Sequence, residues 1–416
     1  MVSRKKTVST TLILIVLFVL FMGARAKRAD AVQDTGMQSN MPAYAARGLY
    51  SVGTRDFVIE GRTPLGVSLW YPALNRDNRE ESITYIYEMK MGDPLGRVSI
   101  AKYAGNAIQD VHYDLSAGPY PLVVLSSGFS IGASSYAWLA EHLASYGFVV
   151  LAPEHQEHLD PENELWRSAI TRPQDILAVF AYVDEQVEAG GQLEGLINVD
   201  QTAVIGHSYG GYTSLAAGGA QIDTIAFKSY CESTSEPDEP GAWLCAQLTP
   251  HIADMASLAD LDAVPDGLWP AWAGLRVDAV VSIAGDAFFF GQPGLAEIDV
   301  PVMAIGGTDD KDSPYMWSTQ PAYEYVSSPR KVRVALEGAE HMIFTGPCEK
   351  VTWYLKFFSD EFCTDPGWNR GYAHNLVKHF TTAFLLSELK QDSAASDALK
   401  SQAVNFIGVT YDVQGY

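Results

Sequence analysis

A serine nucleophile is indicated by residues 204–211, which read VIGHSYGG. A short apolar run leads directly into G-x-S-x-G, and small residues suited to a helix follow. A turn of this kind holds the serine in a strained backbone conformation that exposes its hydroxyl, and the glycines let strand and helix pack closely. We therefore expect Ser208 to attack the carbon of a carbonyl group. The alternative is a tight turn in which Ser208 has no chemical role.

The base that activates this serine is expected to be His341. A serine hydroxyl is a weak nucleophile until a base removes its proton, and the partners of such a turn follow in the order serine, acid, histidine. Of the nine histidines, His341 lies just beyond the last predicted strand and after the candidate acids. His207, inside the turn, and His155 and His158, whose spacing is not that of H-E-x-x-H, are expected to be structural.

The acid that orients the histidine has three candidates. Asp310 follows the predicted buried strand 302–305 and is the first choice, with its neighbour Asp309 as a rival. Asp286 follows the preceding predicted strand, 279–283, and is the main alternative. Such an acid would hold the imidazole in one tautomer and stabilise the imidazolium.

Attack on a carbonyl creates an oxyanion, which needs backbone N–H donors aimed at it. One donor is expected from Tyr209, the residue after the nucleophile. The other is expected from the loop 126–130, which follows a predicted strand and contains Gly128. Phe129 is the candidate in that loop.

The elements that must position these residues alternate along the chain. Two strand-like runs come first, a loop-rich stretch follows them, and short apolar runs then alternate with helical patterns, one of which has Pro173 in its expected first turn. Apolar runs of this length suit strands that are buried on both faces, and repeated strand–helix alternation predicts an α/β fold with a doubly wound, mostly parallel sheet. The expected strands cover 54–59, 67–71, 122–125, 148–151, 202–205, 279–283, 302–305 and 332–336, and the expected helices cover 136–145 and 172–185.

One segment, about 219–275, breaks this alternation. It has no buried-strand run and contains an acidic turn region followed by patches rich in Ala and Leu. Because it follows the strand that carries Ser208, we interpret it as a cap inserted over the end of the sheet where ligands bind. The catalytic domain is expected to cover 46–390, and residues 391–416 are expected to form a C-terminal tail.

The first residues have the three parts of a secretory signal peptide. Basic residues at 4–6 precede eleven apolar residues at 12–22, and 24–26 is an A-x-A site. Eleven residues at about 1.5 Å each span about half of a ~30 Å hydrocarbon layer, so a signal peptide over 1–26 is favoured over an uncleaved membrane anchor. Residues 27–45 are expected to be a linker, and the protein is expected to be secreted or periplasmic, with no membrane span after cleavage.

Export changes how the four cysteines are interpreted. An even number of cysteines in an oxidising compartment indicates two disulfides, and the spacing favours Cys231 with Cys245 and Cys348 with Cys363. A zinc site is the alternative, but the sequence has no C-x-x-C pair and no paired histidines beside the cysteines. We expect no metal and no organic cofactor.

The charge balance excludes some partners. The 416 residues carry 28 Lys and Arg against 50 Asp and Glu, a formal charge of −22. Such a surface repels phosphate backbones and anionic lipid headgroups, so nucleic-acid binding is not expected. The expected partner is a small-molecule or lipid ester, and the sequence leaves the oligomeric state open.

Several segments together resemble the α/β-hydrolases of the platelet-activating-factor acetylhydrolase-like, dienelactone-hydrolase-related family. The matching segments are 68–72 (SLWYP), 127–129 (SGF), 139–150 (LAEHLASYGFVV), 206–211 (GHSYGG) and 338–341 (GAEH). The resemblance implies an α/β-hydrolase fold and carboxylester hydrolysis, with Ser208 as nucleophile, His341 as base, and the amides of Phe129 and Tyr209 as oxyanion donors. Acetylhydrolases of the family place the acid at a sequence like that of Asp286, whereas many bacterial relatives use the later loop that matches Asp310.

Two positions depart from the family pattern. Ser127 stands where the family usually has His before Gly, and the nucleophile is Ser208 where dienelactone hydrolases carry Cys. The expected activity is therefore that of a serine esterase acting on short-acyl or phospholipid-type esters. The alternatives are a polyester or cutin hydrolase and a noncatalytic binding protein that keeps the fold.

Overall fold

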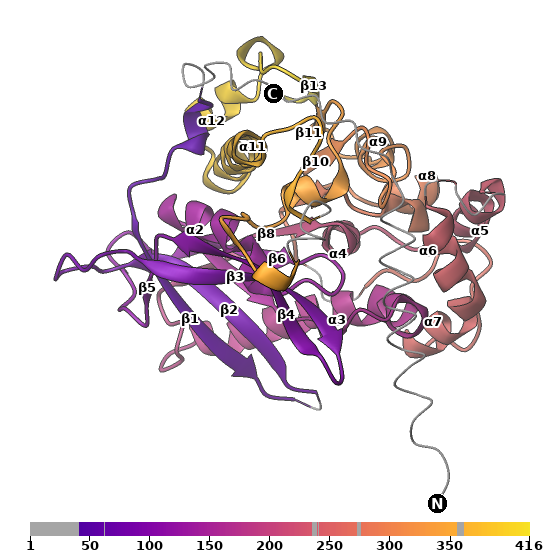
Figure 1. Cartoon of the computed structure of the whole chain (residues 1–416), viewed down its shortest axis with the longest axis horizontal. Helices are drawn as coiled ribbons and strands as arrows, with labels where there is room; N and C mark the ends of the chain where they lie inside the picture. The colour runs from indigo at the N-terminus through magenta and orange to yellow at the C-terminus, as the bar shows by residue number, and fades with distance from the viewer. Residues whose placement is uncertain (1–40, 62, 235–238, 240, 273–275, 356–361) are drawn as a thin grey trace, which may run out of the picture. The chain divides into compact units, whose positions relative to one another are not determined.

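The short apolar runs of the sequence form strands of a ten-stranded sheet in the computed structural model (Figure 1). The structure describes residues 41–61, 63–234, 239, 241–272, 276–355 and 362–416. The expected signal peptide, 1–26, and most of the expected linker, 27–45, lie outside these residues. Within the described ranges, no helix is both long and apolar enough to cross a membrane.

Six neighbouring strands in the middle of the sheet are parallel. They are β6 (Tyr120–Ser126), β7 (Val149–Pro153), β8 (Ile197–His207), β9 (Ala279–Ile283), β10 (Val302–Gly307) and β11 (Lys331–Leu336). The outer strands are β1 (Ser51–Ile59), β2 (Leu65–Ala73), β5 (Ile108–Gln109) and β13 (Val409–Gln414). The predicted doubly wound, mostly parallel sheet is confirmed.

The strand order changes direction near the middle of the sheet. The order is β13-β11-β10-β9-β8-β6-β7-β2-β1-β5. From β6 the chain moves outward to β7 and then crosses back to β8 on the other side of β6. The connections after β6 and β8 therefore leave in opposite directions, and open α/β sheets bind ligands outside the carboxyl ends of strands at such a switch point.

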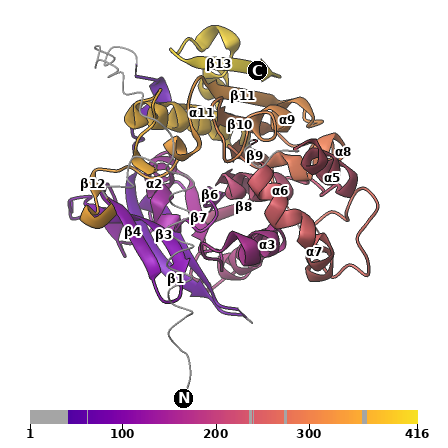
Figure 2. The same ribbon diagram turned by 45° about the vertical axis from the view of Figure 1, so that its right-hand side comes forward.

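Helices cover both faces of this sheet (Figure 2). Val123 and Leu125 of β6 belong to the core that includes α2 (Ala137–Ser145) and α11 (Arg370–Lys390). Leu122 and Val124 belong to the core on the side of α3 (Trp166–Val187). Successive strand side chains point to opposite faces, so both sets are buried and the strand sequence is apolar throughout.

Helix α3 starts earlier than the sequence indicated. Pro173 was expected in the first turn, but the helix begins at Trp166 and Pro173 lies inside it. Proline removes one helical hydrogen bond. Ala169 and Ile170 are buried in the turns before the proline, and their burial stabilises these turns although one helical hydrogen bond is missing.

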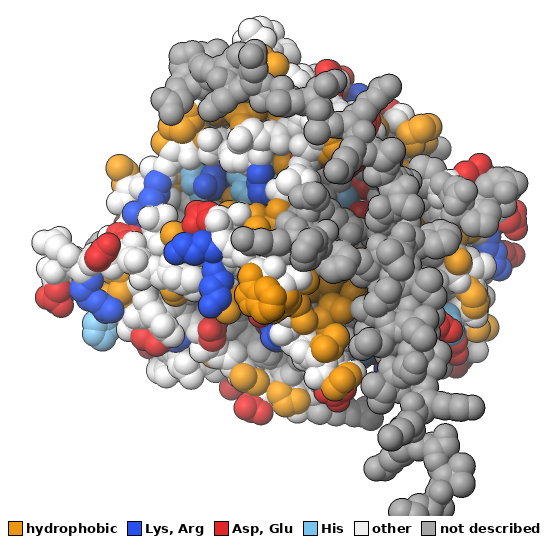
Figure 3. Space-filling view, in the orientation of Figure 1, with side chains coloured by type: hydrophobic (Ala, Val, Ile, Leu, Met, Phe, Trp, Pro, Cys, Tyr) orange, Lys and Arg blue, Asp and Glu red, His pale blue; other side chains and the backbone are white. Residues whose placement is uncertain are grey.

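The stretch expected to be rich in loops contains a second sheet, so this expectation was wrong. β3 (Ile83–Gly92) and β4 (Gly96–Gly105) form an antiparallel hairpin that β12 (Lys350–Val351) extends. Each hairpin strand buries only part of its residues, with tyrosines reaching the core, and therefore has no continuous apolar run. Apolar side chains gather over this sheet in Figure 3, and the large exposed ones in these segments are Leu95, Trp353 and Tyr354.

The segment expected to be a C-terminal tail is part of the main sheet. It contains α12 (Ser393–Ala398) and β13, which pairs antiparallel with β11 over six residues. Arg333 of β11 binds Asp412 of β13 at 2.6 Å. The strand covers the otherwise open edge of β11, where unpaired backbone groups would be exposed.

The segment expected to be a cap is helical in its described residues. α5 (Thr224–Ser233), α6 (Ala242–Leu248) and α7 (Ile252–Leu258) follow α4 (Tyr209–Ala217), and no strand lies between α4 and β9 among the residues that the structure describes there. Their apolar side chains share a core with Tyr209 and Tyr212 of α4. A disulfide between Cys231 and Cys245 joins α5 to α6, and Cys348 is paired with Cys363.

Removal of the first disulfide should destabilise the fold. We expect the double substitution Cys231→Ala and Cys245→Ala to lower the free energy of unfolding by about 3 kcal/mol, because a bridge across a loop of this length restricts the unfolded chain. Urea denaturation under oxidising conditions measures the change. Cys348→Ala with Cys363→Ala is the matched control, since its sequence separation of 15 is close to the 14 of the first pair. An unchanged urea midpoint in both variants would contradict the expectation.

Candidate active site

Ser208 stands between β8 and α4 in a backbone conformation that non-glycine residues rarely adopt. Its φ is 57° and its ψ is −124°. Its N–H donates to Ile283 O of β9 at 2.8 Å, and its carbonyl accepts from Gly211 and Tyr212. A strained conformation persists only where its surroundings fix it in this way. Residues 204–211 therefore form the strand–turn–helix that the sequence predicted.

Two glycines let this turn pack closely against β6. A Cβ on Gly210 would lie 2.1 Å from Ser126 O, and a Cβ on Gly206 would lie 1.9 Å from Gly210 O. Both distances are far below a normal contact, so no other residue fits at either position without movement of the backbone. The end of β6 and the loop after it consequently lie directly beside the nucleophile turn.

The structure brings Ser208, His341 and Asp310 into one hydrogen-bonded chain. His341 Nε2 lies 2.8 Å from Ser208 Oγ, and His341 Nδ1 lies 2.7 Å from Asp310 Oδ2. The other carboxylate oxygen of Asp310 accepts the N–H groups of Asp312 and Ser313. Asp310 and His341 are both buried. This arrangement is the one needed to move a proton from a serine hydroxyl to an imidazole.

The other two candidate acids lie elsewhere. Asp309 is exposed, and its backbone N–H donates to Ala339 O. Asp286 is buried at the start of a short 3₁₀ turn, and its side chain is hydrogen-bonded to Ser313. Burial raises the pKa of Asp286 to about 7, although the bond from Ser313 and the nearby His341 counteract this. A second carboxyl group, partly protonated near neutral pH, therefore lies beside the chain of Ser208, His341 and Asp310.

The surroundings of His341 favour its charged form. Burial lowers the pKa of the ring, but the charge of Asp310 and its hydrogen bond outweigh that effect, with further help from Asp312 and Asp286, and raise the pKa to about 9. The imidazolium that forms when Ser208 loses its proton is thus stabilised by Asp310. Because the pKa is raised by folding, the pairing stabilises the folded chain most below pH 6.5, and this contribution disappears as the pH rises through about 9.

His207 links the loops around Ser208, as expected of a structural residue. Its Nδ1 lies 2.8 Å from Tyr136 Oη, and its Nε2 lies 3.2 Å from His341 O. Tyr136 Oη also accepts the N–H of Gly128 at 3.2 Å. Burial holds the pKa of His207 well below its ordinary value, so the ring is neutral. It connects the turn, the loop of His341 and the loop of Phe129.

The two residues expected to supply oxyanion donors lie on adjoining segments. Phe129 is in the loop after β6, Tyr209 is the first residue of α4, and their rings meet edge to face at 6.1 Å. Among the described residues, neither backbone N–H has a protein acceptor. Ser130, directly after Phe129, has a φ of 59°, so this loop also contains a strained residue.

The remaining predicted residues have structural surroundings. His155 is buried between Asp175 and Ser126, with Nδ1 and Nε2 at 2.7 and 2.8 Å from their side-chain oxygens. His158 is at 3.8 Å from Glu164 near the surface. Within the described part of the chain, no three His, Cys, Asp or Glu side chains are grouped as a metal site would require.

Sequence reasoning missed three buried polar residues next to the site, Tyr136, Glu157 and Arg172. Tyr136 was only the first residue of an expected helix, and Arg172 only the start of another. The sequence carries no motif for any of the three. For Arg172, a charged residue beside a proline is typical of the exposed end of a helix. Their partners come from segments far away in the sequence, as the next sections describe.

Replacing Asp310 should change the titration of His341. In Asp310→Asn we expect the pKa of the imidazole to fall from about 9 to below the ordinary 6.5, because the carboxylate charge is lost while burial remains. An NMR titration of the histidine ring measures this value. Asp286→Asn is the control, and its smaller effect should leave the pKa well above that of Asp310→Asn. A larger fall in Asp286→Asn would make Asp286 the dominant partner.

Comparison with known proteins matches parts of this chain to hydrolase families. The family model for platelet-activating factor acetylhydrolase, isoform II, matches residues 35–162, and the Chlorophyllase model matches residues 111–253. These two matches include β6 and its loop, and the second also includes Ser208 and α4.

Curated relatives are similar over a shorter stretch. Cutinase est1 of Thermobifida alba is 29% identical over 116 residues, which is 28% of this chain and 36% of the relative. A bis(hydroxyethyl) terephthalate hydrolase of Streptomyces coelicolor is 33% identical over 102 residues, and Chlorophyllase-1 of Arabidopsis thaliana is 29% identical over 100 residues; each match covers 24% of this chain and 29% of the relative. The matches thus span about a third of the length of these relatives. Together with the sheet and the turn at Ser208, these matches place the chain among the α/β-hydrolases, with partial similarity to platelet-activating factor acetylhydrolase and to chlorophyllase.

Proposed function

We propose that this protein is a serine carboxylester hydrolase that works through an acyl-enzyme. The observation that carries the proposal is the chain of hydrogen bonds from Ser208 through His341 to Asp310. Ser208 is the nucleophile, His341 the base and Asp310 the acid. The matches to cutinases, a terephthalate-ester hydrolase and a chlorophyllase support ester hydrolysis. An intact proton path argues against a noncatalytic binding protein.

The reaction follows from this geometry in two halves. His341 acts in its neutral form: its Nε2 takes the proton of Ser208 Oγ as the oxygen attacks the ester carbonyl, and the charge that develops on the carbonyl oxygen is met by the N–H groups of Phe129 and Tyr209. Each such donor contributes about 3–4 kcal/mol to transition-state stabilisation. The intermediate collapses to the acyl-enzyme, and the leaving alcohol takes the proton from His341. Water then attacks the acyl group by the same path, which releases the acid and restores Ser208.

We further propose short-acyl or phospholipid-type esters as substrates. The match to an acetylhydrolase family supports this class. The helices α5, α6 and α7, which pack beside α4, are proposed to act as a cap over the substrate. The described acidic residues Glu232 and Glu239 lie in that segment, so a neutral or zwitterionic ester suits it better than a strongly anionic one.

A polyester or cutin-type ester is the second candidate. It is favoured by the similarity to cutinases and to a bis(hydroxyethyl) terephthalate hydrolase. Exposed Leu95, Trp353 and Tyr354 would also suit an ester presented on an apolar surface. The inserted helices count against this candidate, because a polymer chain needs an open approach to Ser208.

Export from the cytoplasm is part of the proposal. Disulfides persist in oxidising compartments, and the chain has two of them. Residues 1–26 are proposed to be a signal peptide, and the protein is proposed to be secreted or periplasmic.

Substitutions in the hydrogen-bonded chain test the mechanism. We expect Ser208→Ala to abolish hydrolysis of p-nitrophenyl acetate, because it removes the hydroxyl that is hydrogen-bonded to His341 Nε2. Asp310→Asn should lower kcat by about 10⁴-fold, since the imidazole loses its orientation and its charge partner. Asp286→Asn is the matched control, and it should retain most of the activity. Undiminished hydrolysis by Ser208→Ala would refute the serine mechanism.

The length of the acyl chain separates the two substrate classes. We expect kcat/KM for p-nitrophenyl esters to fall as the acyl group lengthens beyond a few carbons, because the inserted helices limit the space beside Ser208. Hydrolysis of an acetylated phosphatidylcholine and of bis(hydroxyethyl) terephthalate should be measured in parallel. A preference for the terephthalate ester would select the polyester-type function instead.

A further inference from the structure

Arg172 and Glu157 form a buried ion pair that the proposed reaction does not use. Their side chains are 0% and 1% exposed. Arg172 Nε donates to Glu157 Oε2 at 2.9 Å, and Arg172 Nη2 donates to Glu157 Oε1. Removing two charges from water costs several kcal/mol per ion in a protein interior, so an ion pair at this depth requires a reason beyond the stability of the fold.

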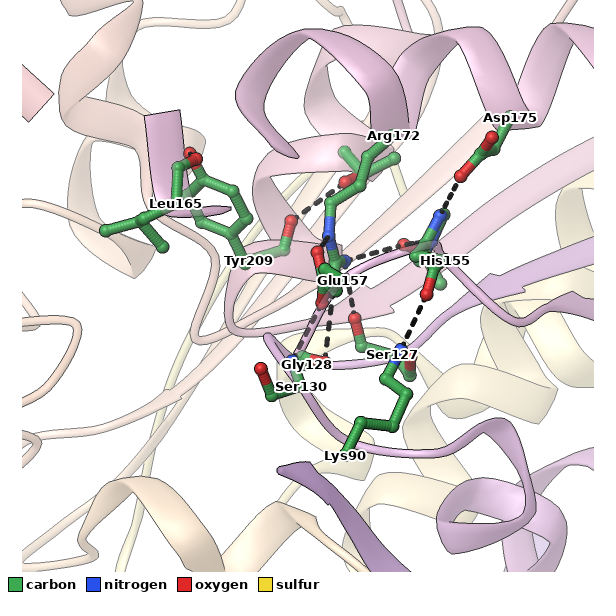
Figure 4. A network of polar contacts seen from close by, with 12 residues as sticks. Lys90, Ser127, Gly128, Ser130, His155, Glu157, Leu165, Arg172, Asp175 and Tyr209 are labelled. Atoms are coloured by element: carbon green, nitrogen blue, oxygen red, sulfur yellow. Dashed lines mark hydrogen bonds and ion pairs between the residues drawn. The ribbon is translucent and has the colours of Figure 1, made fainter. Parts of the chain in front are cut away.

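The other donors of Arg172 all point at the loop that carries Phe129 (Figure 4). Nη1 donates to Ser127 O at 2.7 Å, and Nη2 donates to Gly128 O at 3.1 Å. A third contact, from Nη1 to Ser126 Oγ, is 3.4 Å long. One guanidinium therefore binds three consecutive residues that lead to Phe129.

The bond to Gly128 O acts directly on the N–H of Phe129. The two groups belong to the same peptide unit, which is not among the cis peptides of the chain. In a planar trans peptide the N–H points opposite to the carbonyl, so fixing one fixes the other. Hydrogen bonds in a chain also polarise one another, and a carbonyl that accepts from a charged donor makes its N–H a stronger donor.

Glu157 fixes the peptide on the other side of Phe129. Its Oε1 accepts the N–H of Ser130 at 2.7 Å, while Ser130 O accepts the N–H of Lys90 in β3 at 2.7 Å. Ser130 is the residue with the left-handed φ of 59°, so these bonds stabilise a strained position. The charge of Arg172 and its hydrogen bonds outweigh burial and lower the pKa of Glu157, which keeps the carboxylate charged.

Arg172 also contacts the residue that carries the second donor. Its guanidinium lies over the ring of Tyr209, 5.5 Å from the ring centroid. Tyr209 Oη donates to Leu165 O at 2.8 Å, just before α3 begins. The same cation thus touches the loop of Phe129 and the first residue of α4.

We propose that Arg172 and Glu157 are positioning residues for the oxyanion hole: Arg172 fixes the peptide before Phe129 through Gly128 O, and Glu157 fixes the peptide after it through the N–H of Ser130. This inference rests on the proposed function, because it assigns a role in transition-state stabilisation. Neither residue touches the substrate, and both act through the N–H of Phe129.

The test compares Arg172→Lys and Glu157→Gln with the unaltered protein. Lysine keeps the charge, but its three donors sit on one nitrogen and cannot reproduce the planar fork through which Nε, Nη1 and Nη2 of Arg172 reach Glu157, Ser127 O and Gly128 O. We expect kcat for p-nitrophenyl acetate to fall about 10²-fold with KM little changed, which is the effect of a lost or misplaced oxyanion donor. The inhibition constant of an alkylboronic acid, whose tetrahedral adduct with Ser208 places an oxygen in the oxyanion hole, should rise by a similar factor.

A matched control separates this role from general stability. Arg330, directly before β11, and Glu388 of α11 form an ion pair of the same bidentate geometry, at 2.9 and 2.7 Å. Arg330→Lys and Glu388→Gln should lower the urea midpoint without changing kcat or the boronic acid affinity of the folded protein. If Arg172→Lys and Glu157→Gln behave like these controls, with kcat and boronic acid affinity unchanged, the positioning role is wrong.

A double variant keeps the test possible if the proteins with single substitutions do not fold. Arg172→Met with Glu157→Leu removes both charges of the pair together, and replacements of this kind are tolerated in other proteins. It should fold and still lose kcat and boronic acid affinity, whereas full activity would overturn the inference. Failure of the proposed function gives a different result, since the unaltered protein itself would then show no hydrolysis that depends on Ser208.

Discussion

The close contact of β6, β8 and α4 at Ser208 is the constraint on which the rest of the site depends. Gly206 and Gly210 leave no room for a side chain, so the turn can form only where two strand ends and a helix meet. That contact holds Ser208 in its left-handed conformation, at a cost of about 1–3 kcal/mol that its backbone hydrogen bonds offset. It also fixes the loop after β6 beside the nucleophile. The strand order switches direction at β6, and open α/β sheets bind ligands outside the carboxyl ends of strands at such a point.

Two buried polar networks surround this contact, and Gly128 joins them. Its carbonyl accepts from Arg172, and its N–H donates to Tyr136, which binds His207. His207 in turn lies at hydrogen-bond distance from the carbonyl of His341. Groups buried this deeply are costly unless each has a partner, so the networks restrict the loops to one arrangement. The segments that carry the proposed nucleophile, base and oxyanion donor are thereby held in a fixed relation.

The sequence predicted the parallel strands well and the half-buried strands poorly. Strands such as β6 and β10 are covered by helices on both faces, so they contain an uninterrupted apolar run and the pattern is visible. The hairpin of β3 and β4 buries tyrosines among polar residues, and β13 adds to an edge, so neither has a continuous apolar run. These strands are instead stabilised by contacts with segments that are distant in the sequence. β3 supports the loop of Phe129 through Lys90, and β13 covers β11.

The sequence by itself determined the features that depend on neighbouring residues. These include the turn at Ser208, the position of His341 after the last parallel strand and the pairing of cysteines that lie 14 and 15 residues apart. Only the tertiary structure decided which carboxylate binds His341, because Asp286 and Asp310 both follow buried strands, and only the folded chain shows that Asp310 is hydrogen-bonded to His341 and Asp286 to Ser313. It alone also showed that Arg172 is buried against Glu157 and the loop of Phe129. Neighbouring residues determine the local backbone conformation and the pattern of buried and exposed positions. Which side chains from separate segments come into contact depends on how the sheet, helices and loops pack together.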